Sequence, residues 1–97
     1  MPPSVLENII KVLKTNSFDQ VQKSVTSSIL DGYPAAQIIS QLFDYIVTSA
    51  ELTSLQKASI SEQIASTDKC LNDGADEFLQ LLNVLSFVMR EFSVMKL

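Results

Sequence analysis

Carboxylates and one thiol gather in a short stretch of the sequence, where they could hold a metal ion or act on a substrate. The stretch contains Asp68, Asp73, Asp76 and Glu77, together with Cys70. An EF-hand calcium loop needs alternating oxygen ligands through about twelve residues that end in Glu, and this spacing does not match. Asp73, Asp76 and Glu77 instead stand where the N-cap and first turn of a helix belong, and the helix dipole favours negative charge there. We therefore predict helix capping at these residues and no metal site.

Other features of catalytic sites are missing from the sequence. There is no histidine, which removes the commonest general base and the commonest metal ligand. A single cysteine excludes zinc clusters and dithiol motifs, and Cys70 is predicted to be a small apolar residue at a helix end. Neither Gly-x-x-x-x-Gly-Lys-Ser/Thr nor Gly-x-Gly-x-x-Gly occurs, so no phosphate-binding loop is expected. We predict no catalytic residue and no cofactor in this segment.

The charge balance argues against a strong nucleic-acid-binding surface. Seven Lys and Arg residues stand against eleven Asp and Glu residues, which gives a net charge of −4 at pH 7. Nucleic-acid-binding proteins usually concentrate positive charge on one face, because neutralising phosphates supplies most of their affinity. Lys11, Lys14 and Lys23 could still form a local basic patch. A DNA-binding helical module therefore stays open as an alternative.

Cysteine usage and hydropathy indicate a soluble intracellular protein. Cys70 stands alone, so no intramolecular disulfide can form. The N-terminus lacks the basic region of a signal peptide, and polar residues interrupt the apolar stretch that follows it. No run approaches the roughly 18 apolar residues that a membrane-spanning helix needs.

Helical spacing of apolar residues, with a start signal before each run, predicts five α-helices. Ser17 with Gln20, and Thr53 with Gln56, have the spacing of a capping box. Gly32 supplies the left-handed residue with which many helices end. The predicted helices begin after Ser4 (with Glu7 as its box partner), after Ser17, at Pro34, after Thr53 and after Asp73, and the first four end near Lys14, Gly32, Ala50 and Cys70.

Short loops between these helices predict an all-α, five-helix bundle-like domain that spans residues 1–97. Apolar residues cover about 200 degrees of the third helix, and a helix with so much apolar surface is normally central in a bundle. The fourth helix has only a thin apolar stripe, carried by Ile60, Ile64 and Leu71. The second helix has a narrow stripe of Phe18, Val21, Val25 and Ile29.

The last helix carries more apolar surface than one core-facing stripe needs. Its predicted core face spans about 120 degrees and consists of Phe78, Leu81, Leu82, Leu85, Val88, Met89 and Phe92. A lengthwise row on the other side more often marks contact with a neighbour than scattered exposure. This candidate subunit interface consists of Leu79, Asn83, Phe87, Arg90 and Val94, with Phe87 as the residue that tests it best.

Four segments that span the chain carry a family resemblance. The longest is residues 68–81, Asp-Lys-Cys-Leu-Asn-Asp-Gly-Ala-Asp-Glu-Phe-Leu-Gln-Leu. The others are Ser17-Phe18-Asp19, residues 30–37 (Leu-Asp-Gly-Tyr-Pro-Ala-Ala-Gln) and Leu55-Gln56-Lys57. In these segments the chain resembles eukaryotic replication factor C small subunits, most closely the type called subunit 4 in animals.

That resemblance implies the C-terminal helical domain of an AAA+ clamp-loader subunit. Such domains pack side by side into the collar of a five-subunit assembly, which loads the sliding clamp onto DNA in the nucleus. ATP and Mg²⁺ would bind in upstream AAA+ modules, which lie outside this chain, and contacts to the clamp and DNA would come through the rest of the complex. The expected partners are the other replication factor C subunits, contacted through the outer side of the last helix and parts of the third, with no membrane contact. A helical adaptor that binds a peptide or a partner helix is the alternative.

Overall fold

Five helices make up the domain, and the predicted all-α fold class is confirmed. The computed structural model describes residues 3–94, and side chains as far as residue 93. No strand occurs within this range. The helices are α1 (Pro3–Leu13), α2 (Phe18–Leu30), α3 (Ala35–Thr48), α4 (Ser54–Asn72) and α5 (Glu77–Val94).

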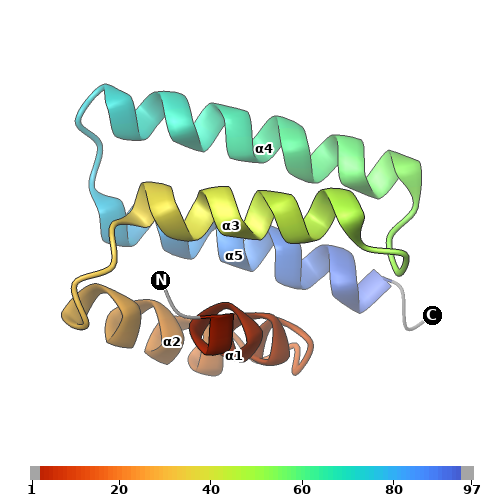
Figure 1. Ribbon diagram of the computed structural model, residues 1–97, viewed down its shortest axis with the longest axis horizontal. Helices are drawn as coiled ribbons and strands as arrows, with labels where there is room; N and C mark the ends of the chain where they lie inside the picture. Colours follow the sequence, from red (N-terminus) through yellow and green to blue (C-terminus); the bar gives the residue numbers. More distant parts are fainter. Residues whose placement is uncertain (1–2, 95–97) are drawn as a thin grey trace.

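α5 is the central helix of the domain. It packs against each of the other four helices, and α4 and α2 are its main neighbours. Figure 1 shows α3 in front of α5, with α4 above this pair and α1 and α2 below it. The predicted central position of the third helix is therefore wrong. α3 packs against α1, α4 and α5, but Phe43 and Val47 on this helix stay 37% and 48% exposed.

All five helices contribute to one apolar core. A surface helix buries one stripe and leaves the opposite side to water, and α4 does so with Ile60, Ile64 and Thr67. Leu71, the third residue of its predicted stripe, is only partly buried against the core. The buried apolar residues are Ile9, Ile10, Leu13, Val21, Val25, Ala35, Ile38, Ile39, Leu42, Ile46, Leu52, Ile60, Ile64, Leu81, Val84, Leu85, Val88, Met89 and Phe92.

Local signals fix several helix ends as the sequence predicts. The Ser17 hydroxyl accepts a hydrogen bond from the Gln20 N–H, which caps α2. Thr53 and Gln56 form both hydrogen bonds of a capping box at the start of α4. Gly32 has φ +86°, in the left-handed region that glycine adopts without a steric penalty, and it follows the end of α2.

Two helix starts differ from the prediction because of proline. α1 begins at Pro3, so Ser4 lies inside the first turn and does not cap the helix. Proline favours this first position, because its fixed φ suits a helix and its missing N–H needs no partner there. Pro34 was predicted at the same position of the third helix, but its ψ of 139° is extended and it stands one residue earlier, at the N-cap.

The acidic residues at and before the start of α5 act at three different helix ends. Asp73 is the C-cap of α4, so its predicted role as a cap of the last helix is wrong. Gly74 follows with φ +94° and reverses the chain, which delays the next helix by three residues. The Asp76 carboxylate accepts a hydrogen bond from the Leu79 N–H at 2.9 Å and so caps α5.

Glu77 reaches across the domain and caps a different helix. Its Oε1 accepts a hydrogen bond from the Ala35 N–H at 3.2 Å. Ala35 is the first residue of α3, is buried, and follows a proline that has no side-chain acceptor to offer. The carboxylate therefore satisfies a helix N–H that would otherwise lack a partner, and it ties the start of α5 to the start of α3.

The other end of α5 is tied to α4. The Gln56 side-chain amide donates a hydrogen bond to the Glu91 carbonyl at 3.1 Å, in addition to its role in the capping box. Lys57, the next residue, donates from Nζ to the Val47 carbonyl at 3.1 Å, near the end of α3. A cation near exposed carbonyls at a helix end is favourable. The start of α4 thus connects the ends of two neighbouring helices.

Removing the α4 cap should destabilise the domain measurably. We expect Thr53→Ala to lower the free energy of unfolding by about 1 kcal/mol, because the Gln56 N–H loses its acceptor. Thr48→Ala is the matched control, since its hydroxyl only bonds back to the Asp44 and Tyr45 carbonyls of its own helix. Its effect should stay within about 0.5 kcal/mol in urea unfolding followed by circular dichroism. Equal effects of both substitutions would contradict the assignment.

The cross-domain cap at Glu77 predicts an order of stability among variants. Glu77→Ala leaves the buried Ala35 N–H without an acceptor and should cost about 1–3 kcal/mol of unfolding free energy. Glu77→Gln keeps an acceptor oxygen and loses only the charge near the α5 start, so it should cost less, about 0.3–1 kcal/mol. Glu62→Ala, at an exposed site on α4, is the control. The same unfolding measurement checks the order, which a Gln variant as unstable as the Ala variant would refute.

Candidate functional site

The buried side of α5 is wider than one stripe because the helix has neighbours nearly all round. Leu81, Leu85 and Val88 are fully buried as predicted. Val84, which the predicted core face does not include, is fully buried as well. Phe78 and Leu82 were predicted in the core and are only partly buried. The exposed part of α5 is therefore a narrow strip.

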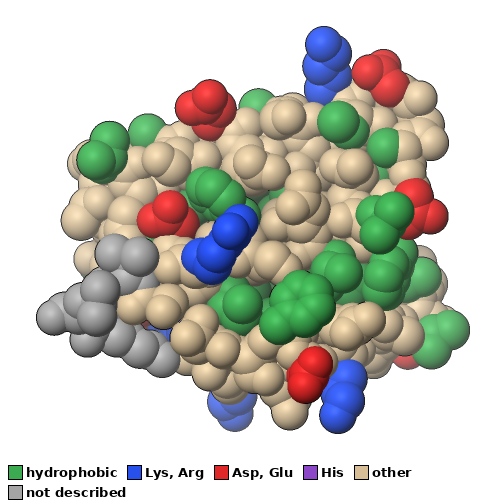
Figure 2. All heavy atoms as spheres, turned by 180° about the vertical axis from the view of Figure 1, so that it is seen from behind, with side chains coloured by type: hydrophobic (Ala, Val, Ile, Leu, Met, Phe, Trp, Pro, Cys, Tyr) green, Lys and Arg blue, Asp and Glu red, His purple; other side chains and the backbone are tan. Residues whose placement is uncertain are grey.

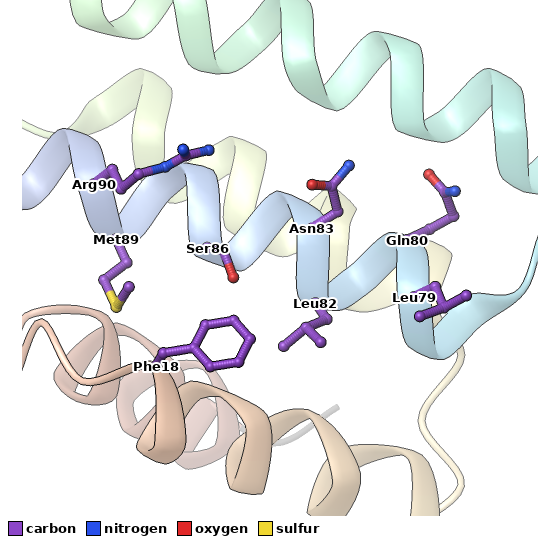
Figure 3. A pocket seen from close by; sticks show the side chains of 8 residues that line it. All are labelled: Phe18, Leu79, Gln80, Leu82, Asn83, Ser86, Met89 and Arg90. Carbon is purple, nitrogen blue, oxygen red and sulfur yellow. The ribbon is translucent and has the colours of Figure 1, made fainter.

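That strip forms one side of a groove between α2 and α5, which we call the α2–α5 groove. It has a volume of about 600 Å³. Its apolar lining consists of Phe18, Leu79, Leu82 and Met89. In Figure 3 Phe18, Leu82 and Met89 lie between the two helices, with Leu79 near the start of α5. Leu79 is 61% exposed and Phe18 is 48% exposed, so a large apolar surface faces water here.

Polar side chains line the rest of the α2–α5 groove. They are Gln80, Asn83, Ser86 and Arg90. Figure 3 shows Gln80, Asn83 and Arg90 on the side of α5 that faces away from α2. The Ser86 hydroxyl oxygen is buried and has no hydrogen-bond partner in the described structure. An apolar centre with a polar rim is the usual composition of a protein-binding surface.

The structure brings three of the predicted interface residues into this groove. Leu79, Asn83 and Arg90 line it. Phe87 does not: it is partly buried against the core, and the Arg90 guanidinium lies 5.9 Å from the centre of its ring. Its predicted place in an exposed row is corrected, because its side chain packs against the core. The side chain of Val94 lies outside the described residues.

Phe18 is the groove residue whose burial the sequence predicts wrongly. The predicted stripe assigned it to the core of the second helix, but it is about half exposed. It is the first residue of α2, where the chain enters the helix beyond the edge of the core. A large aromatic ring directly after an N-cap could have indicated an edge position.

A second apolar groove runs between α3 and α4, and we call it the α3–α4 groove. It has a volume of about 430 Å³. Phe43, Ile39 and Ile64 supply much of its apolar surface, and no residue of α5 lines it. Small residues of both helices line the rest: Ala36, Ser40, Ser61 and Ala65, with Asp68 as the charged member.

Figure 2 shows the opposite side of the molecule from Figure 1, the side on which α5 and α2 lie. Apolar side chains gather from the middle of this face toward its right-hand edge, with acidic and basic side chains around them. The α3–α4 groove belongs to the helices at the front and top of Figure 1. The two grooves are lined by different helices and share no residue.

Three of the residues that could have done chemistry, Asp73, Asp76 and Glu77, act at helix ends. Within residues 3–94 no group of three or more His, Cys, Asp or Glu side chains is placed to hold a metal ion. Cys70 is a half-buried free thiol near the end of α4. Asp73, Asp76 and Glu77 occupy the helix ends described above. In the described part of the chain, no helix is long and apolar enough to cross a membrane.

The candidate basic patch contains a lysine that is already engaged. Lys14 Nζ forms a salt bridge with Glu51 Oε1 at 2.9 Å and lies 5.8 Å from the centre of the Phe92 ring. The hydrogen bond to Glu51 raises the pKa of the Lys14 ammonium, against the opposing effect of burial. A lysine held by a carboxylate and an aromatic ring adds little to a phosphate-binding surface. Lys11 and Lys23 remain exposed.

These features define a class of protein: a small helical domain whose helix-capping residues are structural and whose exposed apolar groove suits a protein partner. Comparison with known families places it more narrowly. Residues 1–86 match the family model described as the replication factor C C-terminal domain. The chain belongs to this family, as the resemblance of its segments predicted.

Relatives from plants and animals agree with this assignment. The chain is 43% identical over 90 residues to replication factor C subunit 2 of Oryza sativa, covering 93% of this chain and 26% of that protein. It is 43% identical over 96 residues to subunit 4 of Arabidopsis thaliana, covering 98% and 28%. It is 37% identical over 93 residues to human subunit 4, covering 96% and 25%. The chain thus spans about a quarter of the length of these relatives.

Substitutions of two leucines of α5, Leu81 and Leu79, should differ strongly in how much they lower the free energy of unfolding. Leu81 is fully buried, so Leu81→Ala should cost about 2–5 kcal/mol of unfolding free energy through lost burial and a cavity. Leu79→Ser removes a largely exposed side chain and should change the unfolding free energy by no more than about 0.5 kcal/mol. Urea unfolding of both variants checks this. A strongly destabilised Leu79→Ser domain would mean that Leu79 belongs to the core.

Proposed function

We propose that this domain assembles subunits of a eukaryotic DNA replication clamp loader. In this proposal it packs beside the matching domains of sister replication factor C subunits and forms part of a pentameric collar. The collar holds the subunits in a fixed arrangement while the complex uses ATP to load the sliding clamp onto DNA. The domain itself acts as a binding module and not as an enzyme.

Membership in the replication factor C C-terminal domain family, over residues 1–86, is the observation that carries this proposal. The exposed apolar surface of the α2–α5 groove supports it, because a domain that packs beside others needs an apolar patch that its own core does not cover. Leu79 and Phe18 supply that patch. The structural roles of the acidic residues at positions 73–77 agree with a function in binding.

The same proposal assigns nucleotide binding and the contacts with the clamp and DNA to other parts of the complex. ATP and Mg²⁺ would bind in AAA+ modules outside the region described here, and this domain would need no cofactor. The sliding clamp and DNA would be reached through the rest of the complex. The nucleus would be the site of action. The net charge of −4 and the pairing of Lys14 with Glu51 fit a domain that does not itself grip DNA.

A helical adaptor is the second candidate, and the size of the α2–α5 groove is what favours it. An amphipathic peptide helix binds in an apolar groove through residues spaced by three or four positions. The two functions differ in what the isolated domain binds. An adaptor binds a short peptide saturably as a monomer, whereas an assembly domain forms a complex with folded sister domains.

Mixing experiments test the assembly function directly. Light scattering should give the mass of a heteromeric complex when the domain is mixed with the matching domains of sister subunits. Leu79→Asp should weaken this association about tenfold or more, because it places a charge on the exposed apolar surface of the groove. Leu30→Asp is the matched control: Leu30 is 80% exposed on α2 and does not line the groove.

Two results would contradict the proposal. One is the absence of any heteromeric complex with any set of sister domains. The other is normal association by a folded Leu79→Asp domain, which would mean that the contact surface lies outside the α2–α5 groove. The substitution Phe87→Asp is a poorer test, because Phe87 packs against the core, so a charge there would change fold stability as well as any contact.

A further inference from the structure

A polar cleft lies between α1 and α2, which pack against each other (Figure 1). We call it the α1–α2 cleft. It has a volume of about 320 Å³ and shares no residue with the α2–α5 groove. α1 supplies its apolar wall, which consists of Val5, Ile9 and Val12. The proposed assembly function makes no use of this cleft.

Ser28 gives the α1–α2 cleft a buried hydrogen-bonding group that the fold does not use. Its side chain lines the cleft although the residue is only 6% exposed. Within residues 3–93 no group forms a hydrogen bond with the Ser28 hydroxyl. The partly or fully buried hydroxyl oxygens that are both unpartnered and sealed from water in this range are those of Thr67 and Ser86, so the Ser28 oxygen stays accessible. A buried hydroxyl in this position needs water or a ligand as its partner.

Four more uncharged polar side chains line the cleft. They are the hydroxyls of Ser24 and Ser27 and the amides of Asn8 and Gln20. In the described part of the chain none of these side chains forms a hydrogen bond. Hydroxyls and amides both donate and accept, as a peptide backbone does with one N–H and one C=O per residue. Beside an apolar wall, these groups suit a peptide with a small apolar side chain.

The charged residues of the cleft favour a ligand with charges of both signs. Lys23 and Asp31 line it, and within residues 3–93 neither forms a salt bridge. A purely anionic ligand would bring negative charge near Asp31, and a purely cationic ligand would bring positive charge near Lys23. A nucleic acid strand is therefore disfavoured, because its phosphates all carry the same charge.

The spacing of the two charges sets the length of the ligand. Lys23 and Asp31 stand eight residues apart in the sequence, which is about 12 Å along a helix. An extended peptide covers about this distance in four residues, and its alternate side chains point to the same side. Lys23, Ser27 and Asp31 also line an adjoining hollow of about 500 Å³, so the surface continues along α2.

We propose that the α1–α2 cleft binds an extended peptide segment with an acidic and a basic residue four positions apart and a small apolar residue midway. The acidic residue pairs with Lys23 and the basic residue with Asp31. The Ser28 hydroxyl forms a hydrogen bond with the peptide backbone between them, and the middle side chain contacts the apolar wall of α1. This inference goes beyond the proposed assembly function and does not rest on it.

Three short peptides test the proposal in an NMR titration of the ¹⁵N-labelled domain. The probe is acetyl-Ser-Asp-Thr-Val-Thr-Lys-Ser-amide, and its two controls carry Lys or Asp at both charged positions. The probe should bind with a Kd of about 1 mM or lower, shift the amide signals of Asn8, Ser24 and Ser28, and bind about fivefold more tightly than either control. General attraction to a domain of net charge −4 would instead favour the dilysine peptide.

Variants of the cleft should change this order in defined ways. Lys23→Glu makes both charges of the cleft negative, so the dilysine peptide should become the tightest ligand. Ser28→Ala should weaken binding of the probe about fivefold, because one hydrogen bond to the peptide is lost while the hydrogen bonds of the fold stay intact.

Matched controls separate the cleft from general charge effects and from the other surface. Lys11→Glu makes the same charge change as Lys23→Glu, from an exposed site on α1 that does not line the cleft. Leu79→Asp alters the α2–α5 groove. Both variants should bind the probe within about twofold of the unaltered domain, since charges far from a contact act weakly at moderate salt.

Four results would overturn the inference. They are the absence of signal shifts with the probe at about 5 mM, tightest binding of the dilysine peptide by the unaltered domain, undiminished binding by a folded Ser28→Ala domain, and shifts of the cleft signals by inorganic phosphate but not by the peptides. The last result would identify an anion site. None of them bears on the assembly function, which the mixing experiment tests at a different surface.

Discussion

The packing of α5 against all four other helices is the constraint on which the rest of the structure depends. Each of the remaining helices is amphipathic and needs an apolar neighbour, and α5 supplies one to all of them. Most of its circumference is therefore buried, including Val84 just beyond the edge of the expected stripe. What remains exposed is the strip at the α2–α5 groove, so the candidate contact surface is the part of the central helix that the fold leaves uncovered.

Hydrogen bonds at the two ends of α5 fix its position relative to α3 and α4. Glu77 caps α3 at one end, and Gln56 of α4 reaches the Glu91 carbonyl near the other. Both use side chains to satisfy backbone groups that helix ends leave without partners. The acidic residues before α5 therefore act on the fold. Their effect on function is indirect, since they position the strip that carries Leu79, Asn83 and Arg90.

The sequence was sufficient for features that depend on local spacing and insufficient for those that depend on neighbours. The caps at Ser17 and Thr53 and the left-handed Gly32 follow from local rules, and five helices follow from apolar periodicity. Periodicity could not show that α5 rather than α3 is central, because both are broadly apolar. It misplaced Phe18 and Phe87 for the same reason, since their exposure depends on where α5 and α4 lie. The predicted role of Asp73 was wrong because both Asp73 and Asp76 could satisfy a capping rule.

The central claim is that the exposed strip of α5 and the edge of α2 form a contact with folded sister domains. The most direct measurement is an amide NMR spectrum of the labelled domain during titration with unlabelled matching domains of sister replication factor C subunits. The account predicts shifted or broadened signals at Phe18, Leu79, Asn83 and Arg90, with little change at Glu7 and Lys11 on α1. Changes confined to α1, with the groove signals unaltered in a formed complex, would contradict it.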